Sequence, residues 1–311
     1  MEFSHKPIMV NECIKGLRIK PDGIYIDGTV GGGGHSGEIA VLLNEKGLLV
    51  GLDRDHEAIT ASKQKLMNLK KNIKLIHTNF SNIKEVVQNN INEFVDGILL
   101  DLGVSSYQLD NAERGFTYQV DARLDMRMDK NQKITAEDVV NDYNKEELLR
   151  IITSYGEERW AKRIVDFIIK YREDKRINST GELVEIIKQA IPVGARREGP
   201  HPAKRTFQAI RIEVNNELNI IKQTIQDAVE CLKDGGRMCI ITFHSLEDRI
   251  VKQTFSSLEG RCTCPKDFPI CKCENKALGK MVNRKPIQPG QDEISINPRA
   301  RSAKLRIFEK C

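Results

Sequence analysis

The chain has 311 residues, of which 40% are hydrophobic and 30% are charged, and its formal net charge is +5. This composition is typical of a folded globular protein and excludes a wholly disordered or fibrous chain. No apolar run approaches the ~18 residues that a membrane span needs, and the first residues lack the apolar core of a signal peptide. We therefore expect a cytoplasmic protein that makes no contact with a membrane.

The first hundred residues alternate short apolar runs with helical patterns. Strands are predicted at 24–26, 48–52, 73–76 and 98–102, and helices at 38–44, 57–69 and 83–87. Strands that alternate with helices indicate βαβ units, and these form a parallel sheet through right-handed crossovers. The fold class is therefore predicted to be α/β.

The middle of the chain has a different pattern. No strand of similar quality occurs between residues 109 and 205, and capping boxes that begin with Thr135 and Ser179 open helices. Sheet character then returns. A single long helix is predicted from Phe207 to Leu232, stopped by Gly235 and Gly236, followed by a strand at 237–243, a helix capped by Ser245 and a last strand at 302–309. We expect a sheet domain formed by 1–108 and 206–311, interrupted by a helical subdomain at 109–205.

A glycine-rich segment, 28–37, follows the first predicted strand. Glycines let a ligand approach the backbone closely, and the helix that follows offers unpaired N–H groups. The formal G-x-G-x-x-G at Gly32, Gly34 and Gly37 is weak evidence by itself, because such turns also serve tight packing. Asp53 strengthens it, since an acid at the end of the second strand can accept both hydroxyls of an adenosine ribose.

Two further acids narrow the choice of ligand. Asp27 stands directly before the glycines, where a carboxylate would repel the pyrophosphate of a dinucleotide but attract the ammonium group of S-adenosylmethionine. Asp101 ends the fourth strand, at the sheet edge where ligands gather in open α/β folds. Three acids at three strand ends favour S-adenosylmethionine.

Several motifs together resemble the ribosomal RNA small-subunit methyltransferase H family, also known as the MraW proteins. They span nearly the whole chain, so the resemblance is far more specific than a glycine loop. The matching segments are 5–9, 25–29 with the glycines and His35-Ser36, 53–55, 101–106, 108–110, 113–116, 124–128, 205–209, 242–248 and 297–302.

The resemblance implies a Rossmann-like S-adenosylmethionine-dependent methyltransferase sheet with an inserted helical substrate-recognition subdomain. It implies methylation of N4 of the decoding-centre (P-site) cytosine in 16S rRNA of the small ribosomal subunit, with no role for DNA. By the same carry-over, Gly33, Gly34 and His35 hold the methionine end of the cofactor, Asp53 the ribose and Phe80 the adenine, and Asp101 and Gln108 complete the pocket.

The exocyclic amine of cytosine is a poor nucleophile and needs an acceptor for its N–H bonds during transfer. Asp101 is the candidate catalytic residue for this task, with a backbone carbonyl as the alternative. Other amino methyltransferases carry an Asp/Asn-Pro-Pro-aromatic turn whose aromatic ring stacks on the base. Here the turn reads Asp101-Leu102-Gly103-Val104, so the stacking residue is open between Tyr107, Phe243 and His244.

Basic residues gather in two places that suit RNA. One cluster lies where the helical subdomain rejoins the sheet, and it contains Arg196, Arg197, Lys204, Arg205 and Arg211. The other is the C-terminal segment 261–311, which has twelve Lys and Arg against five Asp and Glu. The remainder of the chain is slightly acidic, so the positive charge is concentrated and suits rRNA.

The cysteines Cys262, Cys264, Cys271 and Cys273 form two C-x-C pairs. Four thiolates can hold a structural zinc, but C-x-C spacing is less usual than C-x-x-C and no histidine supports it. A thiol-rich loop without metal is the equal alternative, and no metal ligand is assigned.

Two other functions compete with methyl transfer. An NAD-dependent dehydrogenase would share the glycine loop, but Asp27 and the lack of a clear second nucleotide-binding half argue against it. A non-catalytic RNA-binding scaffold on the same fold would have no need of the three strand-end acids.

Overall fold

The computed structural model describes residues 7–196, 199–260 and 276–311. The chain divides into two compact units, one formed by 1–103 and 218–311 and the other by 104–217. No helix of the described residues is long and apolar enough to cross a membrane.

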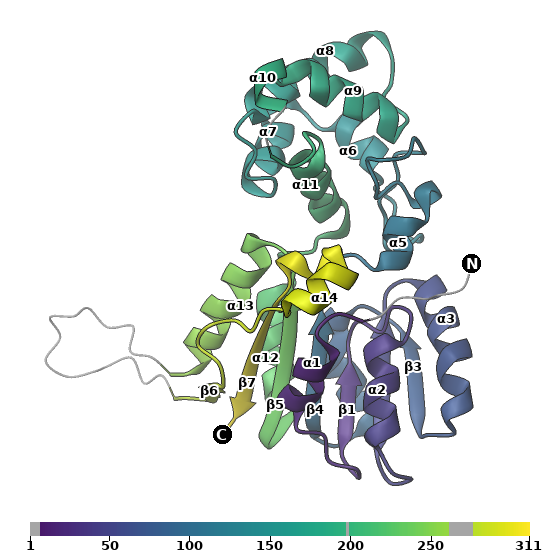
Figure 1. The fold of residues 1–311 in the computed structure, drawn as a ribbon, viewed down its shortest axis with the longest axis vertical. Coiled ribbons are helices and arrows are strands. Elements are labelled where there is room, and N and C mark those ends of the chain that lie inside the picture. Colours follow the sequence, from purple (N-terminus) through teal and green to yellow (C-terminus); the bar gives the residue numbers. More distant parts are fainter. Residues whose placement is uncertain (1–6, 197–198, 261–275) are drawn as a thin grey trace, which may run out of the picture. The chain divides into compact units, whose positions relative to one another are not determined.

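The first unit is built on a seven-stranded sheet in the order β3-β2-β1-β4-β5-β7-β6 (Figure 1). Strands β1 to β5 are parallel, and β7 pairs antiparallel with both β5 and β6. The strands are β1 Ile24–Asp27, β2 Leu48–Asp53, β3 Ile73–His77, β4 Val95–Asp101, β5 Leu232–Thr242, β6 Gly279–Met281 and β7 Lys304–Lys310. This unit has the α/β class that the strand-helix alternation predicted and the Rossmann-like arrangement that the resemblance implied.

Helices cover this sheet. Those of the unit are α1 Val10–Leu17, α2 Gly34–Leu42, α3 His56–Leu66, α4 Ile83–Val86, α12 Ile221–Cys231, α13 Ser245–Leu258 and α14 Gln291–Ile296. Cys13 of α1 and Ile39 of α2 pack with Leu49, Leu99 and Ile241 of the strands in one buried core. Successive residues of β1, β2 and β4 are buried, so both faces of these strands are covered and the strands are nearly continuous apolar runs, as is the second half of β5 from Met238 to Ile241.

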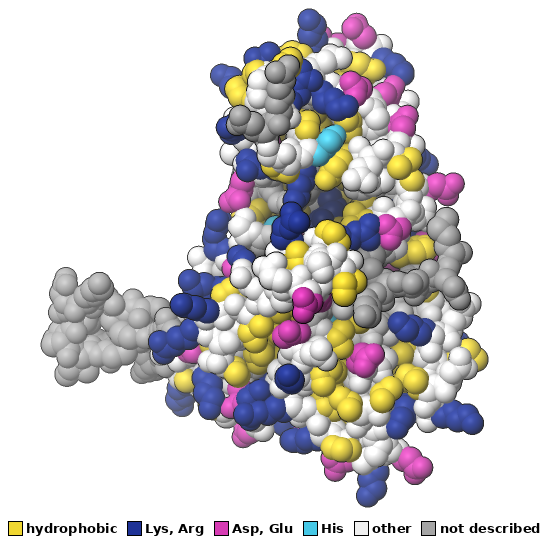
Figure 2. All heavy atoms as spheres, viewed as in Figure 1, with side chains coloured by type: hydrophobic (Ala, Val, Ile, Leu, Met, Phe, Trp, Pro, Cys, Tyr) yellow, Lys and Arg dark blue, Asp and Glu magenta, His cyan; other side chains and the backbone are white. Residues whose placement is uncertain are grey.

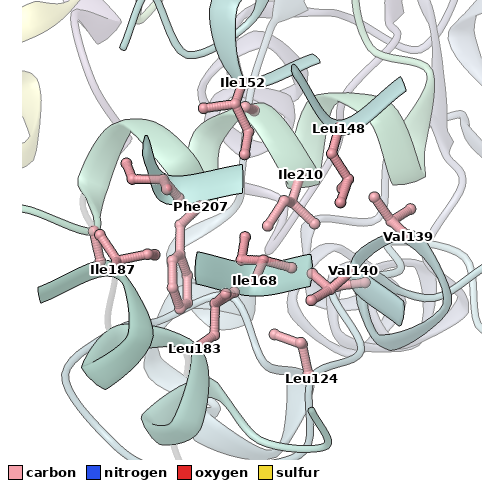
Figure 3. Close-up of a cluster of buried hydrophobic side chains, with 14 of the residues drawn as sticks. Leu124, Val139, Val140, Leu148, Ile152, Ile168, Leu183, Ile187, Phe207 and Ile210 are labelled. Carbon is pink, nitrogen blue, oxygen red and sulfur yellow. The ribbon is translucent and has the colours of Figure 1, made fainter. Parts of the chain in front are cut away.

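The second unit is helical. Its helices are α5 Ser106–Asp110, α6 Ala136–Asp142, α7 Lys145–Ser154, α8 Ala161–Asp174, α9 Thr180–Ala190, α10 Val193–Arg196 and α11 Lys204–Asn215. Thr135 and Ser179 cap α6 and α9 through complete capping boxes, as predicted. Figure 3 shows Ile168, Leu183 and Ile210, from α8, α9 and α11, pointing into a common apolar core.

The unit boundaries lie outside the predicted 109–205. Val104 and Leu109 pack against the helical core, so the unit begins before residue 109. Phe207, Ile210 and Val214 are buried in the same core, so it also extends beyond residue 205. Their apolar side chains join α11 to the helical unit.

The prediction of one helix from Phe207 to Leu232 was wrong. The chain forms two helices, because Asn216 adopts the left-handed conformation (φ 50°) that ends α11, and α12 starts at Ile221. The predicted stop at Gly235 and Gly236 was also misplaced: α12 ends at Cys231, and both glycines lie in an irregular part of β5. His244, not Ser245, is the residue before the first turn of α13.

Candidate functional site

The candidate site lies at one edge of the sheet, where four neighbouring strands end. Tyr25, Leu49, Leu99 and Ile241 belong to the same buried core, so they lie on one face of the sheet. Side chains two or four residues further along a strand return to that face. Asp27, Asp53, Asp101 and Phe243 therefore continue the four rows past the core, at the edge where the carboxyl ends of β1, β2, β4 and β5 meet.

The glycine loop between β1 and α2 is shaped by packing as well as by ligand access. Gly33 precedes α2 with φ 74°, a conformation that favours glycine. A Cβ atom on Gly34 would lie only 2.9 Å from Cβ of Pro7. The first N–H groups of α2 have no partner within the helix, as at every helix start, and they begin at these glycines. The loop thus offers donors to a carboxylate, which fits the methionine end of the predicted cofactor.

Asp27 is 1% exposed, and both of its carboxylate oxygens accept hydrogen bonds from the loop itself. Oδ1 accepts from the backbone N–H of Thr29 (3.1 Å) and Oδ2 from the hydroxyl of Ser36 (2.6 Å). Burial raises the pKa of Asp27, while His35 and these donors oppose the rise. Asp27 therefore stabilises the conformation of the glycine loop.

Asp53 ends β2 and faces the same loop. Its Oδ2 accepts from the N–H of Gly31 and its Oδ1 from the N–H of Asp55, both at 2.8 Å. These bonds fix the carboxylate but leave each oxygen a second lone pair, which suits the two hydroxyls of a ribose. Burial raises the pKa of Asp53 to about 6.

Asp101 and His35 lie next to each other. Nε2 of His35 donates to the carbonyl oxygen of Ile8 (2.9 Å), and its Nδ1 lies 3.8 Å from Oδ2 of Asp101. The other oxygen, Oδ1 of Asp101, accepts no hydrogen bond from any described residue, although its side chain is only 26% exposed. Burial raises the pKa of Asp101 to about 6, and His35 opposes the rise. An unsatisfied buried acceptor beside the glycine loop fits a ligand donor.

The two remaining residues predicted to contact the cofactor, Phe80 and Gln108, belong to different units. Phe80 begins a short 3₁₀ turn, Phe80–Asn82, after β3, and its Cβ lies 3.2 Å from the position a Cβ on Gly28 would take. It therefore stands beside the start of the glycine loop. Gln108 belongs to the helical unit, where its Oε1 accepts from the N–H of Ser105 and completes the capping box of α5.

Sequence reasoning missed Glu247. This carboxylate is 1% exposed, and its Oε2 accepts from the backbone N–H groups of Phe243 (2.8 Å) and His244 (3.3 Å). Two sequence signals were available: Glu247 lies in the matching segment 242–248, and a glutamate at the third position of α13 is typical of a capping box. The cysteines Cys262, Cys264, Cys271 and Cys273, and with them the alternative of a zinc site, lie outside the described residues.

Comparison with known proteins gives a consistent result. Residues 2–311 match the MraW methylase family. Three curated relatives are named ribosomal RNA small subunit methyltransferase H. They come from Acetivibrio thermocellus (62% identical over 312 residues), Clostridioides difficile (56% over 310) and Ruminiclostridium cellulolyticum (56% over 313), and each alignment covers 100% of both chains. The strand-end acids, the glycine loop and this match over nearly all residues lead to one conclusion: the chain belongs to the MraW methylase family and is an S-adenosylmethionine-dependent methyltransferase.

Proposed function

We propose that this enzyme methylates N4 of the decoding-centre (P-site) cytosine in 16S rRNA of the small ribosomal subunit. The names of its relatives support an rRNA substrate, because they are small-subunit rRNA methyltransferases at 56–62% identity. The observation that carries the chemistry is the unsatisfied Oδ1 of Asp101 at the carboxyl end of β4. An amine that is being methylated needs such an acceptor.

The residues of the sheet unit divide the work of binding. Gly33, Gly34 and His35 at the start of α2 would hold the amino-acid end of S-adenosylmethionine, Asp53 the ribose and Phe80 the adenine ring. Gln108, which belongs to the helical unit, stays a prediction from the family resemblance. When bound, S-adenosylmethionine supplies a methyl group on a sulfonium whose sulfur keeps the electron pair of the broken C–S bond.

Asp101 would act on the other partner of the reaction. As a carboxylate, its Oδ1 accepts an N–H bond of the cytosine amine, which increases electron density on N4 and orients its lone pair. The N–H becomes more acidic as N4 forms its new bond to carbon, and the released proton passes to Asp101. The raised pKa of Asp101, about 6, makes this carboxylate a better proton acceptor than an exposed aspartate while leaving it mostly ionised at neutral pH.

The helical unit is proposed to hold the surrounding RNA. Lys and Arg side chains, dark blue in Figure 2, recur across the visible face with acidic side chains between them, so charge alone does not single out a surface. Within the predicted cluster, the guanidinium of Arg211 donates two hydrogen bonds to the carboxylate of Glu217, with N–O distances of 2.9 and 2.8 Å. Arg197 lies outside the described residues. Lys204 and Arg205 are exposed and remain suited to RNA.

Two arginines of the segment 159–167 extend this surface. Arg205 donates to the backbone oxygen of Glu157, which places the start of α11 beside that segment. The exposed guanidinium of Arg159 lies 5.6 Å from the ring centroid of Trp160, and that of Arg163 lies 5.8 Å from the ring centroid of Phe167. Cations next to aromatic rings suit the phosphates and bases of RNA. We call Arg159, Trp160, Arg163, Phe167 and Arg205 the basic-aromatic surface.

The test is methyl transfer from labelled S-adenosylmethionine to small subunits that lack the modification, followed by digestion to nucleosides. We expect label in N4-methylcytidine at the decoding centre. Label in another nucleoside, or at another cytosine, would refute the proposed target. Cofactor binding without any transfer would favour the non-catalytic scaffold.

A further inference from the structure

Other amino methyltransferases stack an aromatic ring on the target base, and the turn Leu102-Gly103-Val104 after β4 contains no aromatic residue. We propose that Phe243, at the end of the neighbouring strand β5, stacks on the target cytosine and holds it beside Asp101. This inference rests on the proposed function, since it assigns a residue to the base that the enzyme methylates.

Strand register places Phe243 next to the turn. Asp101 pairs with Ile241 in the parallel ladder, and the N–H of Leu102 donates to the carbonyl oxygen of Ile241 (3.0 Å). Continued for two residues, this register sets Gly103 against Phe243. A Cβ on Gly103 would indeed lie 3.4 Å from Cδ2 of the Phe243 ring. Gly103 also has φ 104°, which favours glycine, so the turn brings no side chain against the ring.

Side-chain alternation places the ring and the carboxylate on the same face of the sheet. Asp101 follows Leu99 by two residues, Phe243 follows Ile241 by two, and Leu99 and Ile241 share one buried core. Phe243 itself is partly buried against that core. The edge thus presents an aromatic ring and an unsatisfied carboxylate oxygen from adjacent strands, and a flipped amino base can stack on the first and donate a hydrogen bond to the second.

The other two candidates are less suited. The imidazole of His244 is 11% exposed and its Nε2 lies 3.1 Å from Oε1 of Glu247, so the ring lies against that carboxylate, although neither ring nitrogen makes a hydrogen bond with a described residue. Tyr107 lies outside the sheet unit that contains Asp101, so strand register gives it no position beside that carboxylate. Glu247 has a positioning role, because its Oε2 accepts from the N–H of Phe243 (2.8 Å) and fixes the backbone that carries the ring.

The test compares Phe243→Leu, which keeps an apolar side chain, with Phe243→Tyr, which keeps the ring. Stacking contributes about 1–3 kcal/mol per base, and we therefore expect the leucine variant to lose roughly tenfold in kcat. The KM for small subunits should change by less than about threefold, because most contacts with the subunit lie elsewhere. The tyrosine variant should stay close to wild type. Phe94→Leu is the control, since Phe94 is 60% exposed in another part of the sheet unit.

The affinity for S-adenosylmethionine and the melting temperature separate a stacking role from a structural one. Unchanged values in the leucine variant, together with the loss in kcat, would support the proposal. A leucine variant with wild-type kcat would overturn it, and so would a tyrosine variant as slow as leucine or a leucine variant that loses cofactor affinity. These rates are measured on whichever base is methylated, so a wrong target nucleoside would refute the proposed function without deciding the role of Phe243.

Discussion

The strand-end acids of the sheet unit and the paired acids of the helical unit have opposite environments. In the sheet unit, burial raises the pKa of Asp53 and of Asp101 to about 6, and Oδ1 of Asp101 accepts no hydrogen bond from the described residues. In the helical unit, a hydrogen bond from Lys175 holds the pKa of Glu182 below its ordinary value. Burial acts against ionisation of Asp125 too, but hydrogen bonds from Arg127 dominate and lower its pKa.

This difference separates acids that bind a ligand from acids that hold the fold. A carboxylate with an arginine partner has its bonding capacity filled within the chain. A desolvated carboxylate without such a partner raises the free energy of the folded state and indicates a functional site. The following predictions test whether the division is correct.

The largest effect is expected for Asp101→Asn. The amide keeps the shape of the side chain but cannot take the proton from N4, so the single-turnover rate of methyl transfer should fall about 10²- to 10⁴-fold. The variant should still bind S-adenosylmethionine within about tenfold of wild type. A variant that methylates at more than a tenth of the wild-type rate would show that another group accepts the proton.

The next effect is expected for Asp53→Asn, which removes the charged acceptor proposed for the ribose. Hydrogen bonds to charged groups contribute about 1.5–3 kcal/mol, so the Kd for S-adenosylmethionine should rise roughly tenfold to a hundredfold. Isothermal titration calorimetry measures this change. A matched control is Asp125→Asn, an acid of the helical unit, which should leave the Kd unchanged.

The affinity of the wild-type enzyme for cofactor should depend on pH. Asp53 accepts ribose hydroxyls as a carboxylate and has a pKa of about 6, so affinity should be full at pH 7.5 and decrease as the pH falls through 6. Asp53→Asn should show a smaller decrease, due to the other buried acids of the site, Asp27 and Asp101. Identical pH curves for the two proteins would assign the dependence to other groups.

Asp125→Asn should reduce stability and spare cofactor binding. Asp125 accepts three hydrogen bonds from Arg127, from Nε at 2.8 Å, from Nη2 at 2.7 Å and from the backbone N–H at 3.0 Å. Loss of the Asp125 carboxylate should reduce the free energy of unfolding by about 2 kcal/mol at pH 7, measured by denaturant titration. Because the folded pKa of Asp125 is lowered, this contribution exists above the unfolded pKa and disappears as the pH falls through the folded one. An equal loss at pH 7 and at pH 3 would contradict the assignment.

The smallest effect concerns the basic-aromatic surface. Arg159→Ser combined with Arg163→Ser should weaken RNA binding and make the slope of log K against log salt shallower by about 1–2, because two phosphate contacts are lost. Lys46→Ser, an exposed charge of the loop between α2 and β2, is the control and should leave the slope unchanged. An equal change of this slope in the double arginine variant and in Lys46→Ser would indicate that RNA is attracted by the overall charge of the protein and not by this surface.

Elements with a strong local signal could be predicted from the sequence. Strands β1 to β4 appear as apolar runs, and three of them end in Asp27, Asp53 and Asp101, which are the acids that form the site edge. The boundary between α11 and α12 could not be predicted, because apolar residues continue at helical spacing across Asn216 and only the separation of the two cores explains the break.

Contacts between segments that are far apart in the sequence could not be predicted from sequence patterns. Strand β6 has only three residues and depends on pairing with β7. The proximity of Phe243 to Gly103 depends on the register of β4 with β5, and that of His35 to Asp101 on the path of the glycine loop. The role of Glu247 likewise depends on backbone groups that the sequence does not reveal.

The central claim is that the strand-end acids of the sheet unit and the loop beside them form the cofactor site. Hydrogen–deuterium exchange of the unmodified protein, with and without S-adenosylmethionine, tests it most directly. We predict that the cofactor slows exchange at 28–37, 53–55, 80–82 and 101–103, with little change across α6 to α9 of the helical unit. Protection confined to the helical unit, with these four segments unaffected, would contradict the account.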